Sequence, residues 1–170
     1  MDAITLRVFA VSGFSGTGKT SLIEDLIKEL KSRGYSVSVV KSSREDIEPP
    51  KGTDTYRHLT ASASPVVLLG PNTTTIRYQH RLNSGAIFSQ VDADIVLLEG
   101  FKSALIPRVF CVGKRGLNED TIPEQTHAIV TWNRTDMKKH SEIPILYTRE
   151  TDRIADLILQ NAVQPNQVDF

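Results

Sequence analysis

Hydrophobic positions along the chain fall into two kinds of pattern, short apolar runs and longer stretches striped at helical spacing. The runs predict strands over 4–11, 35–40, 65–70, 74–78, 94–98, 108–112, 128–131 and 143–147. The stripes predict helices over 21–33 and 152–162, with shorter helices over 54–63 and 83–91. Strands that alternate with helices predict an α/β fold, with a mostly parallel central sheet and helices on both of its faces.

Residues 4–40 have the pattern of a single β-α-β unit. An apolar stripe runs along 21–33, and Gly34 follows it where a helix would end. Two strands joined in this way imply a parallel pair with a right-handed crossover. The next stretch, 41–53, is polar and contains two prolines and a glycine, which predicts a mobile loop.

Between the first strand and the first helix, the sequence fits the phosphate-binding P-loop, G-x-x-x-x-G-K-[ST], as Gly13-Phe14-Ser15-Gly16-Thr17-Gly18-Lys19-Thr20. Glycines adopt conformations closed to other residues, so successive backbone N–H groups can converge on one phosphate. The helix that follows adds its free N–H groups and its dipole. This setting predicts a P-loop NTPase rather than a glycine-rich turn in another fold.

The polar side chains of the P-loop have expected roles. Lys19 would reach the β- and γ-phosphates and act in catalysis, and Thr20 would hold Mg²⁺ through its hydroxyl. Ser21 could add a hydroxyl near the α-phosphate, although a serine in the first helical turn is commonly just solvated. The predicted nucleotide-binding residues of this segment are Gly13, Ser15, Gly16, Thr17, Gly18, Lys19, Thr20 and Ser21.

Length and composition favour an ordinary cytoplasmic protein. At 170 residues we expect one domain over 1–163, with a frayed tail over 164–170. Lys and Arg number 20, as do Asp and Glu, so no basic excess points to nucleic acid or to a membrane surface. No apolar stretch approaches the ~20 residues of a membrane span, and no signal peptide is evident. The single cysteine, Cys111, lies in an apolar run and suits a buried thiol in a reducing compartment.

A second part of the nucleotide site is predicted at the end of the apolar run 94–98. This run leads into Glu99, and an acidic residue at the end of a buried strand is the Walker B arrangement that steers Mg²⁺. Asp is more usual at this position, and the alternative is that Glu99 merely caps the strand. The P-loop in the same chain favours the Mg²⁺ role.

The base and the γ-phosphate have weaker candidates. The stretch 133–136, with Asn133 and Asp136, resembles the N-K-x-D motif of guanine-binding proteins, with Arg in place of Lys. A polar surface turn explains it equally well. In the loop 41–53, Asp46 is the best candidate to orient a water or sense the γ-phosphate, and a solvated run of charges is the alternative. The four histidines lack the spacing of a metal site.

Taken in order, the P-loop, the Asp54-Thr55-Tyr56-Arg57-His58 segment and the strand that ends in Glu99-Gly100-Phe101-Lys102 resemble the molybdopterin-guanine dinucleotide biosynthesis protein B (MobB) family. The similarity runs from about residue 5 to 115, and less clearly to 159. The last two segments are more diagnostic of this family than the P-loop, which many families share.

The resemblance implies a protein that binds GTP with Mg²⁺ and hydrolyses it slowly. It further implies a homodimer that acts in molybdenum cofactor biosynthesis, as an adaptor to the MobA-type guanylyltransferase that joins GMP to molybdopterin. The residues that the resemblance carries over are Gly16, Gly18, Lys19, Thr20 and Glu99, together with Asp54 and Arg57.

Three other functions compete with this interpretation. An ATP-dependent small-metabolite kinase needs a lid that carries two or more arginines, and the chain offers Arg108 and Arg115 but no arginine-rich, glycine-bounded lid in the usual place. A metal-insertion GTPase would carry cysteine and histidine clusters, whereas this chain has one cysteine. A binding module with a decayed site would not be expected to keep Lys19 and Thr20 together.

Overall fold

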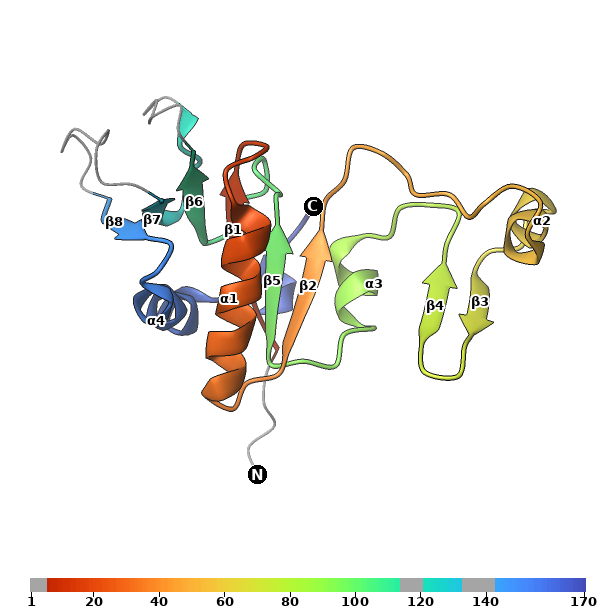
Figure 1. Ribbon diagram of the computed structural model, residues 1–170, viewed down its shortest axis with the longest axis horizontal. Helices are drawn as coiled ribbons and strands as arrows, with labels where there is room; N and C mark the ends of the chain where they lie inside the picture. Colours follow the sequence, from red (N-terminus) through yellow and green to blue (C-terminus); the bar gives the residue numbers. More distant parts are fainter. Residues whose placement is uncertain (1–5, 114–120, 133–142) are drawn as a thin grey trace.

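The computed structural model describes residues 6–113, 121–132 and 143–170. Its centre is a six-stranded sheet in the order β2-β5-β1-β6-β7-β8, in which every neighbouring pair is parallel (Figure 1). The strands are β1 (Arg7–Gly13), β2 (Val37–Lys41), β5 (Ile95–Glu99), β6 (Arg108–Val112), β7 (Thr126–Thr131) and β8 (Ile145–Tyr147). The parallel α/β sheet predicted from the sequence is confirmed.

The strand order corrects one prediction, because β1 and β2 do not form a pair. β5 lies between them, with Glu99 in register with Val11 of β1 on one side and Lys41 of β2 on the other. All five side chains of β5 are buried, so this apolar strand is stabilised best in the interior of the sheet. The helix that joins β1 to β2 therefore passes across β5 rather than linking neighbours.

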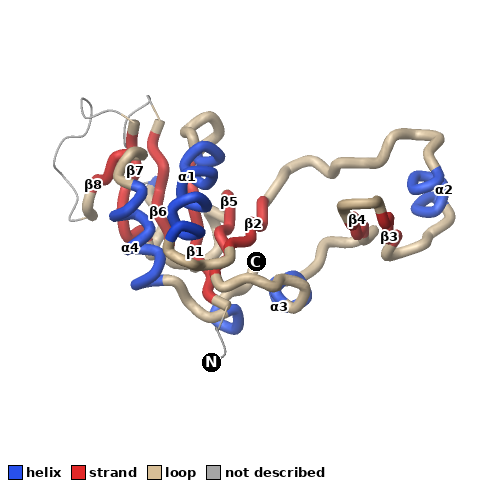
Figure 2. Tube along the Cα trace, turned by 60° about the horizontal axis from the view of Figure 1, so that its bottom comes forward, coloured by secondary structure: helices blue, strands red, loops and turns tan. Residues whose placement is uncertain are grey.

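Helices cover both faces of the sheet, but unequally (Figure 2). On one face, side chains such as Phe9 and Val11 pack against α1 (Lys19–Ser32) and α4 (Thr151–Asn161). On the other face, Val8 and Ala10 belong to a smaller cluster that includes Phe88 of the short helix α3 (Ser84–Phe88). Successive β1 side chains alternate between the faces, so the strand reads as a continuous apolar run. None of the helices in the described ranges is both long and apolar enough to cross a bilayer.

The C-terminal residues complete the smaller face, which corrects the expectation of a frayed tail over 164–170. Val163 exchanges two backbone hydrogen bonds with Val8, and a 3₁₀ helix follows over Pro165–Gln167. Val168 is buried, and the Phe170 ring lies 4.4 Å from that of Phe101. These apolar residues cover sheet surface that the short α3 leaves open, and their burial favours an ordered end.

An arm formed by residues 54–77 projects from the β2 edge of the sheet (Figure 1). It contains α2 (Asp54–Thr60) and the antiparallel hairpin β3 (Val66–Leu69) and β4 (Thr74–Arg77). Helix α2 begins after Thr53, whose hydroxyl accepts a hydrogen bond from the Tyr56 N–H. The arm exposes several large apolar side chains, at 51% for Val67, 56% for Leu68, 76% for Leu69 and 48% for Ile76.

Candidate functional site

The P-loop joins the end of β1 to the start of α1, and its glycines are required by their backbone and surroundings (Figure 1). Gly13 has φ +146°, and a Cβ on it would lie 2.5 Å from the carbonyl oxygen of Cys111. Gly18 has φ +81°, and a Cβ there would lie 2.3 Å from the Trp132 ring. Both positions therefore exclude other residues by strain and by contact.

The Lys19 ammonium is held at this loop. Its Nζ donates a hydrogen bond of 2.6 Å to the carbonyl oxygen of Phe14, near the other end of the loop. Burial lowers the pKa of Lys19 from its ordinary value, although Glu99 opposes this shift. The amine thus lies over the backbone where phosphates are expected, and it makes no ion pair in the described chain that would have to break first.

Glu99 brings the P-loop and the β2 edge together. Its Oε1 accepts a 3.1 Å hydrogen bond from the Thr20 hydroxyl and lies 3.2 Å from Lys41 Nζ. Glu99 is 7% exposed, because β5 is flanked on both sides at this point. A hydroxyl and a carboxylate oxygen are ligands that Mg²⁺ accepts, so the two residues predicted for the metal lie together.

Lys41 and Lys102 complete a group of cations around the loop. Lys102 Nζ lies 4.5 Å from the centre of the Phe14 ring, and that ring packs edge-on against Phe110. Lys41 and Lys102 both act on Lys19 electrostatically, each lowering its pKa. Three ammonium groups and one carboxylate therefore share this edge of the sheet, a charge balance that suits a polyphosphate with a divalent cation.

Arg108 holds the segment that follows Glu99, a role that the sequence did not reveal. The side chain is 1% exposed, and burial lowers the pKa of its guanidinium. The guanidinium donates hydrogen bonds to Ser12 Oγ and to backbone carbonyls of Phe101, Lys102, Ala104 and Ile106. Because it is occupied in this way, Arg108 is not placed to act as a lid arginine of a kinase. The one signal in the sequence was an arginine at the start of a buried strand.

Trp132 is a second residue whose place could not be read from the pattern. It follows β7, and its indole Nε1 donates a 3.2 Å hydrogen bond to the carbonyl oxygen of Thr17. The ring also covers the Cα of Gly18. The P-loop is therefore held from the β7 side as well as by its own strand and helix.

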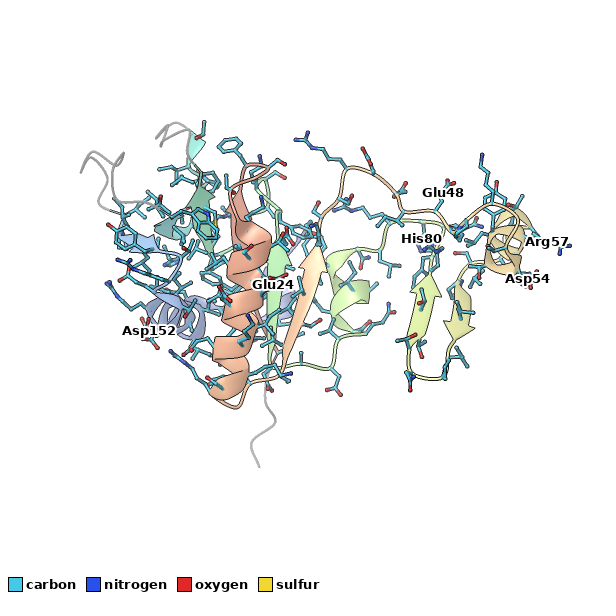
Figure 3. All side chains as sticks on the ribbon, in the orientation of Figure 1. Glu24, Glu48, Asp54, Arg57, His80 and Asp152 are labelled. Atoms are coloured by element: carbon cyan, nitrogen blue, oxygen red, sulfur yellow. The ribbon has the colours of Figure 1, made fainter. Side chains whose placement is uncertain are left out.

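Of the other predicted residues in the described chain, Asp46, Asp54 and Arg57 lie away from the P-loop. Asp46 lines a cavity of about 710 Å³ beside the arm, together with Arg77 and His80 but with no residue of the P-loop, so its catalytic role stays a prediction. Asp54 and Arg57 lie on α2 at the outer end of the arm, 3.7 Å apart (Figure 3). Asn133 and Asp136 lie outside the described residues.

Cys111 is buried next to Gly13 of the P-loop. Burial raises the pKa of the Cys111 thiol to about 12, which fits a buried structural cysteine rather than a nucleophile. Among the described residues, no cluster of three or more His, Cys, Asp or Glu side chains could hold a metal ion. A Mg²⁺ ion at Thr20 and Glu99 would therefore need oxygen ligands from phosphate and water.

Comparison with known families identifies the chain. The sequence profile of the family described as "Molybdopterin guanine dinucleotide synthesis protein B" matches residues 8–132. The chain belongs to the MobB family. The match begins in β1 and ends at Trp132, so it includes the P-loop, Glu99 and the arm.

Two MobB relatives illustrate the extent of the similarity. A putative molybdopterin-guanine dinucleotide biosynthesis adapter protein of Methanocaldococcus jannaschii is 33% identical over 133 residues, which are 74% of this chain and 55% of the relative. The molybdopterin-guanine dinucleotide biosynthesis adapter protein of Haemophilus influenzae is 35% identical over 110 residues, which are 61% of this chain and 62% of the relative. The chain thus spans little more than half the length of these two relatives.

Solved MobB structures share the fold. The crystal structure of Bacillus subtilis MobB has a TM-score of 0.73 at 23% identity, covering 92% of this chain and 98% of that one. A MobB homologue from Bacillus stearothermophilus has a TM-score of 0.64 at 19% identity, covering 90% and 95%. At these identities the likeness concerns the fold, and it agrees with the mostly parallel α/β sheet predicted from the sequence.

Proposed function

We propose that this chain binds GTP with Mg²⁺ at the P-loop and acts in the cytoplasm as an adapter in the biosynthesis of molybdopterin guanine dinucleotide. The observation that carries the nucleotide site is the 3.1 Å hydrogen bond between Thr20 and Glu99, which unites the P-loop with the end of β5. The adapter role is supported by the family match and by the names of the two relatives.

The residues of the site divide the work of holding a triphosphate. The P-loop N–H groups and the start of α1 would bind the phosphates, and Lys19 would contact the β- and γ-phosphates. Thr20 and Glu99 would hold Mg²⁺, which neutralises phosphate charge when it is bound. Lys19 would also stabilise the charge that develops on the γ-phosphate during slow hydrolysis. The proposed role of Asp46 in this step depends only on its place in the segment after β2.

The choice of guanine over adenine depends on Asn133 and Asp136. An Asp in this motif would accept hydrogen bonds from the two guanine donors, a pair that adenine lacks. The runner-up function, an ATP-dependent small-metabolite kinase, is disfavoured because the Arg108 guanidinium is occupied by backbone carbonyls.

The arm supports the proposal of a homodimer. Within the described ranges the strands of this hairpin pair only with each other, and the hairpin exposes the apolar side chains of Val67, Leu68 and Leu69. Exposed apolar strands of this kind are covered in stable proteins by another surface. Light scattering should show a dimer that Leu68→Asp dissociates, whereas Leu105→Asp, at a residue 61% exposed away from the arm, should leave it intact.

Calorimetry with GTP and ATP in the presence of Mg²⁺ tests the nucleotide site. Lys19→Ala should abolish binding, while Lys31→Ala, at an exposed lysine of the same helix, should not. Asp136→Ala should remove any preference for GTP. Equal affinity for ATP and GTP in both the wild type and Asp136→Ala would contradict the guanine assignment.

The adapter role needs a separate assay. Formation of the dinucleotide by a MobA-type guanylyltransferase from GTP and molybdopterin should rise when this chain is added. The Lys19→Ala variant should not produce that rise, and the Lys31→Ala variant should. An equal yield with and without the wild-type chain would contradict the adapter role and leave nucleotide binding unaffected.

A further inference from the structure

Trp132 is an aromatic side chain anchored at the P-loop while much of it stays in solvent. Its N–H bonds to the Thr17 carbonyl, and the edge of its ring lies over Gly18. The residue is nevertheless 52% exposed, and it is the single tryptophan of the chain. A large indole is usually well buried in a monomer, so an anchored and half-exposed one marks a contact surface.

The sheet order shows on which side of the phosphates this surface lies. Glu99, which is proposed to hold the metal, and Lys41 beside it come from β5 and β2, on one side of β1. Trp132 follows β7, on the opposite side of β1. A nucleotide whose γ-phosphate and Mg²⁺ lie towards β5 extends its nucleoside away from that side, towards β7.

We propose that the exposed face of Trp132 is the platform on which the nucleobase of the bound nucleotide stacks. This inference rests on the proposed function of the P-loop as a nucleoside triphosphate site. The hydrogen bond to Thr17 fixes the indole before any ligand arrives, so little side-chain freedom is lost on stacking. Because Trp132 contacts Thr17 and Gly18, the proposed base platform is attached directly to the loop that is proposed to bind the phosphates.

Stacking on an indole would set affinity without selecting the base, because every purine presents a π-face. Any preference for guanine must then come from hydrogen bonds made by other residues. Trp132 is therefore expected to contribute equally to GTP and to ATP, and nothing to a ligand without a base. This separates its role from that of Lys19, which would contact only the phosphates of the nucleotide.

The test compares GTP, ATP and inorganic tripolyphosphate by calorimetry, each with Mg²⁺, on the wild type, Trp132→Leu and Trp132→Phe. Trp132→Leu keeps an apolar side chain over Gly18 but removes the aromatic face. It should lose about tenfold in affinity for both nucleotides and keep its affinity for tripolyphosphate within about twofold. Trp132→Phe retains an aromatic face and should keep most of the affinity for GTP.

Three results would overturn the platform. GTP affinity could be unchanged in Trp132→Leu, or GTP and tripolyphosphate could weaken together, in which case the ring only supports the P-loop. Equal losses of GTP affinity in the Phe and Leu variants would assign the effect to the indole N–H. Failure of the proposed function looks different, because the wild type itself would then bind neither nucleotide nor tripolyphosphate.

Discussion

The Lys41 ammonium lies 3.2 Å from the Glu99 carboxylate, where the ends of β2 and β5 adjoin. The same oxygen, Oε1, accepts the hydroxyl of Thr20. A cation of the protein therefore occupies the neighbourhood that the proposed Mg²⁺ would share. The lysine side chain is 60% exposed, so it can withdraw to solvent, whereas Glu99 is fixed in the sheet.

Lys41→Met should make nucleotide binding more dependent on Mg²⁺. Without the metal, the variant lacks a positive charge beside the phosphates, and with the metal it lacks a competitor for Glu99. Both effects raise the ratio of affinities with and without Mg²⁺, by about threefold to fivefold for a pair exposed on one side. Titrations of GTP in Mg²⁺ and in chelator measure this ratio. Lys51→Met, at an exposed lysine nearer the arm, should leave it unchanged.

Gly18→Ala should destabilise the fold more than Gly34→Ala. Both glycines have positive φ, at +81° and +89°, so each alanine carries a strain of about 1 kcal/mol. A Cβ on Gly34 meets nothing within 4 Å, whereas one on Gly18 collides with the Trp132 ring. Urea unfolding of both variants measures the difference in their free energies of unfolding. Adding Trp132→Ala to each variant should reduce that difference. Equal losses of unfolding free energy in the two alanine variants would show that the Trp132 ring moves aside freely.

Arg108→Met should lower the free energy of unfolding by about 3 kcal/mol or more, since it removes the buried hydrogen bonds that the guanidinium donates to the Ser12 hydroxyl and to the carbonyls of Phe101 and Ile106. Arg44→Met, at an exposed arginine, is the matched control and should change stability little. Arg108→Lys should recover only part of the loss, because an ammonium cannot reach the same set of acceptors. A loss below about 1 kcal/mol in Arg108→Met would contradict the anchoring role.

Asp94→Asn should reduce the loss of stability in acid. The Ser36 N–H and hydroxyl donate to Asp94 Oδ2 at 2.6 and 2.7 Å and hold the pKa of that carboxyl below its ordinary value of 3.8. A carboxyl whose folded pKa is depressed stabilises the fold above its unfolded pKa, and this contribution disappears as the pH falls through the folded value. Denaturant unfolding at neutral pH and at pH ~3 should therefore differ less in Asp94→Asn than in the wild type. Asp92→Asn, at an exposed neighbour, should follow the wild type.

Local patterns in the sequence were sufficient to predict the helices and strands, and to single out the P-loop and Glu99 of the candidate site. The apolar run before Glu99 predicted β5 and its acidic end, and the glycine pattern predicted the P-loop and the start of α1. These features depend on residues close together in the chain, where periodicity and conformational preference act directly. Thr20 and Glu99 could be paired in advance because a known motif supplies the geometry.

The other contacts of the candidate site depend on the order of the strands in the sheet, which cannot be derived from hydrophobic periodicity. Lys41 meets Glu99 only because β5 enters between β1 and β2. Trp132 reaches Thr17 across 115 positions of sequence. The tail has too few apolar residues for a helical or strand pattern. The order of Val168 and Phe170 depends on the sheet surface that they cover, which the sequence does not show.

The position of β1 has a consequence for the growing chain. Both strands that border β1 come late, since β5 begins at Ile95 and β6 at Arg108. During synthesis, the phosphate-binding loop therefore emerges from the ribosome long before either neighbour that supports it. Both edges of β1 therefore stay unpaired until β5 and β6 have been synthesised. Long-range pairing of this kind is slow, because distant segments must be brought together first, so the newly made chain passes through a period in which it is open to chaperones and to aggregation.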